Sequence, residues 1–158
     1  MHNRSLRQQS PRTRTQTHLR VMAYKSELLD VWQRALEYID QVHAIADQLP
    51  KRERYNLRDQ MTRAANSIAL NIAARRLLLP FGQGAEGSTG LSDAEQDRFL
   101  RIAIRSLLET VACLHLVDRR EYLDDTESLR AAYRESETLF AKLQAFRSSL
   151  EESSGVQE

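Results

Sequence analysis

Four stretches of apolar residues spaced by three and four positions constrain the fold more than any other feature of this sequence. In the first stretch, the apolar side chains share one face of a helix: Leu28, Trp32, Ala35, Ile39, Val42, Ala46 and Leu49. Pro50 ends this pattern. The second stretch begins after residue 56, with Leu57, Met61, Ala64, Ala65, Ile68 and Ile72 on one face. The first half of the chain therefore predicts two amphipathic helices.

The second half repeats the pattern. Ser92, with Glu95 three residues later, forms a capping box that predicts a helix start. The apolar stripe that follows is Leu100, Ile104, Leu107, Val111 and Leu114, flanked by Phe99, Ala103, Cys113 and Val117. The apolar surface of this predicted helix is broader than one bundle core needs, which suggests a subunit interface. The fourth helix is predicted from about residue 126 to 150, with Leu129, Ala132, Tyr133, Leu139, Phe140, Leu143 and Phe146 inward.

No segment alternates with the period of two that a strand requires. Only 5 Gly and 3 Pro occur among the 158 residues, which also favours helix. We therefore predict an all-α fold, an up-down-up-down antiparallel four-helix bundle over residues 22–150. Residues 1–21 are predicted to be a disordered basic arm, and residues 151–158 a disordered tail. No apolar stretch approaches the roughly 20 residues of a membrane span.

The arm at residues 1–21 has five arginines and no acid, so the remaining chain is net acidic. One interpretation is a nucleic-acid-binding arm or a targeting peptide. The alternative is a stretch translated from a start codon upstream of Met22, where the patterned sequence begins. The single cysteine, Cys113, excludes an intrachain disulfide and is typical of a reducing compartment, so we expect a cytoplasmic protein.

Residues 82–87 read Gly-Gln-Gly-Ala-Glu-Gly and match the dinucleotide-binding pattern G-x-G-x-x-G. That pattern works only between a strand and a helix whose first amides meet the pyrophosphate. Here residues 73–79 favour helix, Pro80 ends it, and the next helix begins near Ser92. A phosphate-binding loop would also need a lysine at Ser88. We predict no nucleotide or other cofactor, and a flexible connection instead.

Catalytic and metal-binding patterns are also weak. The nearest match to the Glu-x-x-His motif of di-iron bundles is Asp40-x-x-His43, and it occurs once. Cys113 lies in an apolar stripe, where a thiol usually packs, and no base is positioned to activate it. We therefore predict no metal site, no catalytic residue, no small-molecule substrate and no enzyme activity.

Polar residues on the second and third predicted helices form the candidate site. Gln60, Arg63, Ser67 and Asn71 share one face of the second helix, and Ser106 and Glu109 lie three apart on the third. In a structural interpretation, Arg63 pairs with Glu109 between helices, and Asn71 caps or bridges the end of the second helix. In a functional interpretation, this face is a recognition surface. The candidate residues are Arg54, Tyr55, Arg58, Gln60, Arg63, Asn71 and Glu109.

Basic residues gather between the first two predicted helices, at Lys51, Arg52, Arg54, Arg58 and Arg63. Arginines beside Tyr55 are suited to phosphate contact and base stacking in a nucleic acid. A solvated charged face is the alternative. Because the patterned part of the chain is net acidic, a nucleic-acid footprint would be local.

Four segments resemble a known family: residues 31–37 (VWQRALE), 50–73 (PKRERYNLRDQMTRAANSIALNIA), 85–87 (AEG) and 99–110 (FLRIAIRSLLET). They are similar to the four helix bundle protein family, whose founding members are encoded in intervening sequences of bacterial 23S ribosomal RNA genes. The family reads NIAEG unbroken, whereas here about twelve residues, 74–85, interrupt the motif. Arg105 also stands where the family has glycine. We expect the second helix to extend into the insertion, to about Leu78.

The resemblance, which covers about residues 23–150, implies a homo-oligomer, a pentamer in this family. It also implies a scaffold or interaction module that acts with structured RNA or an RNA-processing protein. The ribosomal RNA gene context suggests this role, as do related bundles that assist the reverse transcriptase of diversity-generating retroelements. The alternative is a purely protein-binding oligomeric adaptor without nucleic-acid contact.

Overall fold

The computed structural model describes residues 11–77 and 93–154, with side chains for residues 28–74 and 94–149. The helices are α1 (Pro11–Asp47), α2 (Leu57–Leu77), α3 (Asp93–Arg119) and α4 (Glu127–Ser154). A short 3-10 helix, η1 (Lys51–Glu53), lies between α1 and α2. The described ranges contain no strand. The predicted all-α fold is confirmed.

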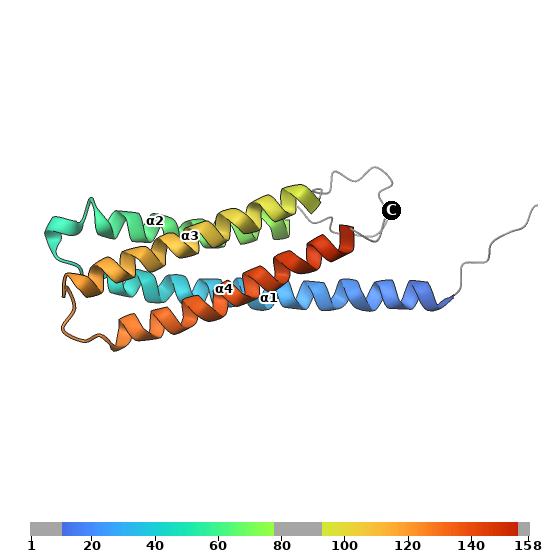
Figure 1. Ribbon diagram of the computed structural model, residues 1–158, viewed down its shortest axis with the longest axis horizontal. Coiled ribbons are helices and arrows are strands. Elements are labelled where there is room, and N and C mark those ends of the chain that lie inside the picture. Colours follow the sequence, from blue (N-terminus) through green and yellow to red (C-terminus); the bar gives the residue numbers. More distant parts are fainter. Residues whose placement is uncertain (1–10, 78–92, 155–158) are drawn as a thin grey trace, which may run out of the picture.

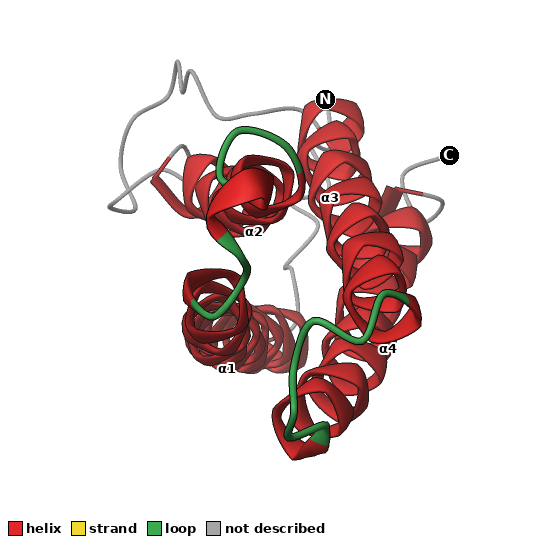
Figure 2. Cartoon of the chain, turned by 90° about the vertical axis from the view of Figure 1, so that its left-hand side faces the viewer, coloured by secondary structure: helices red, strands yellow, loops and turns green. Residues whose placement is uncertain are grey.

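The four helices form one bundle. Each helix packs against its neighbour in sequence, and α4 packs back against α1. Figure 1 shows that successive helices run in alternating directions along the long axis. The end-on view in Figure 2 places α1 and α3 at opposite corners, with α2 and α4 between them. The outward sides of α1 and α3 therefore face away from each other.

The apolar stripes form the core, as predicted. The stripe of α1 is buried except for the half-buried Trp32, and the whole stripe of α2 is buried. In α3, Leu100, Leu107 and Leu114 are fully buried, and Val111 is half-buried. One continuous apolar cluster joins all four helices. Its formation removes these side chains from water, which is the main force that stabilises the bundle.

Packing within the bundle accounts for three of the residues that broaden the apolar surface of α3, and the predicted subunit interface stays a prediction. Ala103, Cys113 and Val117 flank the central stripe, and all three are buried within the bundle. Because α3 packs against α2 on one side and α4 on the other, it needs a wide apolar surface within a single chain. Among the described side chains of α3, the exposed large apolar residues are Leu108 and Leu116, whose exposed fractions are 52% and 42%.

The helix ends differ from the sequence-based expectations in places. Residues 11–21, expected to be disordered, are helical in α1, which begins at Pro11. Proline suits the first position of a helix, and the arginine, glutamine and leucine that follow favour helix. Residues 151–154, expected in a disordered tail, continue α4. Residues 1–10 and 155–158 lie outside the described residues.

Helix α2 continues past residue 73 to Leu77, the last residue described in this part of the chain, in agreement with the predicted extension to about Leu78. The glycine pattern, Ser92 and the rest of residues 78–92 lie outside the described residues, so the insertion itself stays a prediction. Helix α3 begins at Asp93, directly after Ser92.

One polar pair lies inside the core. The hydroxyls of Tyr38 in α1 and Thr110 in α3 are 2.6 Å apart, and both residues are fully buried. The Thr110 hydroxyl donates to the carbonyl oxygen of Leu107 at 2.7 Å, so the Tyr38 hydroxyl is the donor to Thr110. Burial raises the pKa of Tyr38 to about 12, although the hydrogen bond to Thr110 opposes that effect. This pair links two helices that otherwise make few contacts.

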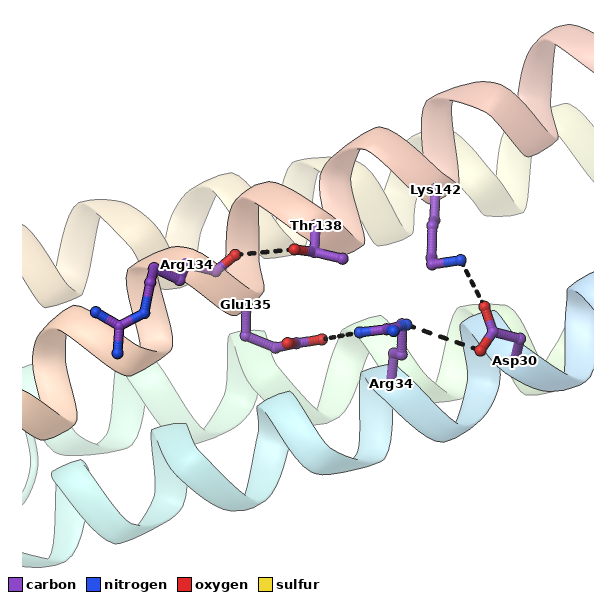
Figure 3. Close-up of polar contacts among 6 residues, drawn as sticks. All are labelled: Asp30, Arg34, Arg134, Glu135, Thr138 and Lys142. Atoms are coloured by element: carbon purple, nitrogen blue, oxygen red, sulfur yellow. Dashed lines mark hydrogen bonds and ion pairs between the residues drawn. The ribbon is translucent and has the colours of Figure 1, made fainter.

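Ion pairs fix the position of α4 along the bundle (Figure 3). Asp30 of α1 accepts from Lys142 of α4 at 2.6 Å, and Arg34 of α1 donates to Glu135 at 3.2 Å. The Lys142 hydrogen bond holds the pKa of Asp30 below its usual range. On the other side of α4, Arg147 donates to Asp97 of α3 at 2.6 Å.

Candidate functional site

The predicted basic patch lies at the end of the bundle where α1 turns into α2 (Figure 1). Pro50 adopts an extended conformation, with φ −60° and ψ 150°, and directs the chain out of α1. The turn is then closed by backbone hydrogen bonds, from Glu53 to Pro50 at 2.8 Å and from Asn56 to Glu53 at 3.2 Å. We call residues 51–56 the basic turn.

Glu53 anchors the basic turn to the rest of the bundle. Its carboxylate is buried and accepts hydrogen bonds from Tyr122 at 2.6 Å, Asn56 at 2.9 Å and Arg120 at 3.2 Å. The Tyr122 hydrogen bond outweighs burial and holds the pKa of Glu53 below its usual range. Because Tyr122 and Arg120 lie in the connection between α3 and α4, this carboxylate joins the two connections at this end of the bundle. Glu53 was not among the predicted site residues, and its one signal in the sequence is that it is the sole acid among residues 51–55.

Arginine side chains lie against two tyrosine rings at this end. The guanidinium carbon of Arg52 is 5.4 Å from the centre of the Tyr122 ring, and that of Arg120 is 6.0 Å from the same centre. The guanidinium carbon of Arg54 is 5.5 Å from the centre of the Tyr55 ring. All three contacts are within cation–π distance.

Tyr55 and the cations of the basic turn are open to solvent. Tyr55 is 86% exposed, the largest value among the large apolar side chains that the structure describes. Lys51, Arg52 and Arg54 are exposed as well, and among the described side chains none of them forms an ion pair. Arg58 differs, because it forms an ion pair with Asp47 of α1. The structure therefore brings Arg54 and Tyr55 together, while the Arg58 charge helps to hold α2 to α1.

Hydrogen bonds join polar residues of α2 and α3 along the seam between the two helices. Gln60 donates to Glu109 at 2.6 Å. Further along the seam, Ser106 donates to Ser67 at 2.8 Å. Asn71 donates to the carbonyl oxygen of Ser67 at 2.7 Å, within α2.

The predicted pairing of Arg63 with Glu109 is wrong. The Glu109 carboxylate accepts from Gln60, and Arg63 pairs with Asp59, one turn earlier on α2, at 3.2 Å. The Arg63 side chain is 70% exposed, so it lies on the outward side of α2. Asn71 does not cap the helix either, because α2 continues for six residues beyond it, to Leu77.

We expect Arg63→Ala to change the free energy of unfolding by less than about 0.5 kcal/mol, because exposed ion pairs one turn apart contribute little. Gln60→Ala is the matched comparison on the same helix, and it removes the contact to Glu109. Urea unfolding followed by circular dichroism measures both. A loss above 1 kcal/mol for Arg63→Ala would contradict its outward position.

The described side chains do not form a metal site. Within them, no group of three or more His, Cys, Asp or Glu residues could hold a metal ion. His43 lies 3.0 Å from the Asn66 side-chain oxygen, and Cys113 is buried, which raises the pKa of its thiol. None of the helices, over their described residues, has the combined length and apolarity needed to cross a bilayer.

Residues 27–76 match the family described as 23S rRNA-intervening sequence protein. The resemblance to this family is confirmed over that segment. It runs from the middle of α1 through the basic turn and most of α2, so Arg54, Tyr55 and Glu53 all lie within the part that matches the 23S rRNA-intervening sequence proteins.

A solved structure has a similar fold. It is the crystal structure of a protein of unknown function from the S23 ribosomal protein family of Bacteroides thetaiotaomicron, with a TM-score of 0.62 and 21% sequence identity. The alignment covers 77% of this chain and 98% of that one. None of the curated proteins matches this chain.

Proposed function

We propose that this protein is a non-enzymatic, self-associating bundle that acts in the cytoplasm and binds structured RNA through the basic turn. The observation that supports this most is the exposed Tyr55 ring beside Arg54, in a turn where three cations have no ion pair among the described side chains. The family that residues 27–76 match takes its name from the intervening sequences of 23S rRNA, which agrees with an RNA partner.

The chemistry of the turn fits an RNA segment with unpaired bases. Lys51, Arg52 and Arg54 offer positive charge to phosphate oxygens, and each phosphate neutralised releases a condensed counterion. The Tyr55 ring offers a flat apolar surface on which a base can stack, and the Arg54 guanidinium can stack against the same base.

The anchoring of the turn adds to this argument. Because the Glu53 carboxylate holds the turn through Tyr122, Arg120 and Asn56, the backbone around Tyr55 needs little ordering on binding. Preorganisation of this kind lowers the entropic cost of association.

The proposal predicts a specific loss of RNA affinity. We expect Tyr55→Ala to weaken binding of a labelled hairpin RNA about 10- to 100-fold, since base–aromatic stacking contributes about 1–3 kcal/mol per base. Arg54→Ala should reduce the slope of log affinity against log salt by about 1. Fluorescence anisotropy over a salt series measures both quantities.

Arg134→Ala is the matched control, because Arg134 is exposed on α4 and pairs only locally with Glu127. It should leave RNA affinity within about twofold, since its charge is paired with Glu127 and it stands outside the basic turn. No binding of any RNA at low salt would refute the RNA role.

One observation favours the alternative, a protein-binding adaptor. Leu70 on α2 is 67% exposed, and Leu108 on α3 is 52% exposed. Exposed leucines suit a protein partner better than a nucleic acid, because protein interfaces bury apolar side chains at their centre. Failure of RNA binding together with intact self-association would favour the adaptor.

A further inference from the structure

Helix α1 is longer than the bundle to which it belongs. It has 37 residues, whereas α2, α3 and α4 have 21, 27 and 28. In Figure 1, the N-terminal part of α1 continues past the described ends of the other three helices. This part of the chain is therefore placed to contact a partner.

The contacts between α1 and α4 show where α1 leaves the bundle. Lys142 of α4 pairs with Asp30 of α1, and α4 ends at Ser154, twelve residues further along. The two helices run antiparallel, so Ser154 is about level with the residue twelve positions before Asp30, which is His18.

The other two helices reach less far along α1. Asp93 begins α3 17 residues before Thr110, which contacts Tyr38, so α3 starts about level with residue 21. In α2, which contacts His43 through Asn66, the last residue is eleven positions past that contact and about level with residue 32. Residues 11–17 therefore have no described helix beside them, and we call them the α1 extension.

The composition of the α1 extension favours a nucleic acid. It reads Pro-Arg-Thr-Arg-Thr-Gln-Thr, so it has no acid, and every residue after the proline can donate a side-chain hydrogen bond. A helix that lies on a bilayer needs an apolar face, and the centre of a protein interface is apolar as well. Arginine, threonine and glutamine are instead typical contacts of phosphate and sugar.

Continuity with α1 supports such a contact. Three of the seven residues are threonine, a weak helix former, so this short sequence would not stay helical alone. As the start of α1 it needs no separate nucleation. The α1 extension is thus already helical without a partner, which lowers the cost of ordering on binding.

We propose that the α1 extension is a second RNA contact, made through Arg12 and Arg14. This inference rests on the RNA binding proposed for the basic turn and adds a separate surface to it. The two contacts lie at opposite ends of α1, about 50 Å apart (Figure 1). An RNA that reaches both is held by two segments, and each one raises the local concentration of the other.

Two RNA probes test the second contact. A single hairpin of about six base pairs is about 20 Å long and reaches one contact at a time. A tandem RNA, in which about 20 unpaired nucleotides join two such hairpins, reaches both. We expect the tandem RNA to bind the full chain at least about tenfold more tightly than the single hairpin. Fluorescence anisotropy over a salt series measures both affinities.

The variant that carries Arg12→Gln and Arg14→Gln should lose most of this gain. Its affinity for the single hairpin should change by less than about twofold, and the salt slope of the tandem RNA should fall by about 1.5–2. Glutamine favours helix about as well as arginine, so circular dichroism should be unchanged. The matched control is Arg98→Gln with Arg105→Gln, because both arginines are exposed on α3 and form no ion pair among the described side chains. It should keep the gain.

Tyr55→Ala separates this inference from the proposed function, because it should weaken binding of both RNAs. A tandem gain that persists in the Arg12→Gln, Arg14→Gln variant would overturn the second contact and leave the basic turn unaffected. Absence of binding to either RNA at low salt would refute the basic turn as well. Binding to vesicles with about 30% phosphatidylserine, lost in that variant while the tandem gain persists, would assign the α1 extension to a membrane surface instead.

Discussion

Leu107→Ala will lower the free energy of unfolding by about 2–5 kcal/mol, the usual range for a buried leucine. Leu107 lies on the inward side of α3 and has no exposed surface. Its side chain belongs to the apolar cluster that joins all four helices, so truncation leaves a cavity that the surrounding helices fill only in part. Urea unfolding at a fixed protein concentration measures the loss.

The neighbouring Leu108 provides the control. Leu108→Ala removes the same atoms from a side chain that is 52% exposed, so the free energy of monomer unfolding should change by less than about 0.5 kcal/mol. Equal losses of monomer stability for the two variants would contradict the orientation of α3.

Thr110→Val will destabilise the protein by about 1–3 kcal/mol, more than Tyr38→Phe at the other end of the same hydrogen bond. Valine keeps the shape of threonine but cannot accept a hydrogen bond, so the buried Tyr38 hydroxyl loses its acceptor. In Tyr38→Phe, by contrast, Thr110 still donates to the Leu107 carbonyl oxygen, and no buried donor is left without a partner.

The double variant makes this prediction sharper. With Thr110→Val in place, Tyr38→Phe removes the unpaired hydroxyl, so it should cost nothing further or recover part of the loss. Additive losses in the two single variants and the double variant would show that the two hydroxyls do not interact. Thermal unfolding followed by circular dichroism measures all three.

The sequence predicted the bundle well because burial and helical periodicity depend on the same residues. Apolar residues spaced by multiples of three or four positions, such as Leu100, Leu107 and Leu114, lie on one face of a helix. Such an apolar face is stable in water only when it is buried in a core. The extension of α2 to Leu77 followed from local helix propensity in the same way.

The side-chain pairings of the candidate site were less predictable. Gln60 and Arg63 are about 60° apart around α2, so the pattern assigns both to one face, and a modest rotation of the helix decides which one reaches Glu109. The contact of Glu53 with Tyr122 joins residues 69 positions apart, and no local pattern reports such a pair. The charge pattern did indicate the exposed Arg54 and Tyr55, because residues in a turn lie on the surface.

The Glu53 contacts divide the molecule into two dissimilar ends. They lock the connections at one end, whereas α2 stops and α3 starts at the far end (Figure 1), about 30 Å away by the length of α2. A change in the length of the α2–α3 connection should therefore leave the hydrogen bonds of Glu53, and with them the shape of the chain next to Tyr55, unaltered.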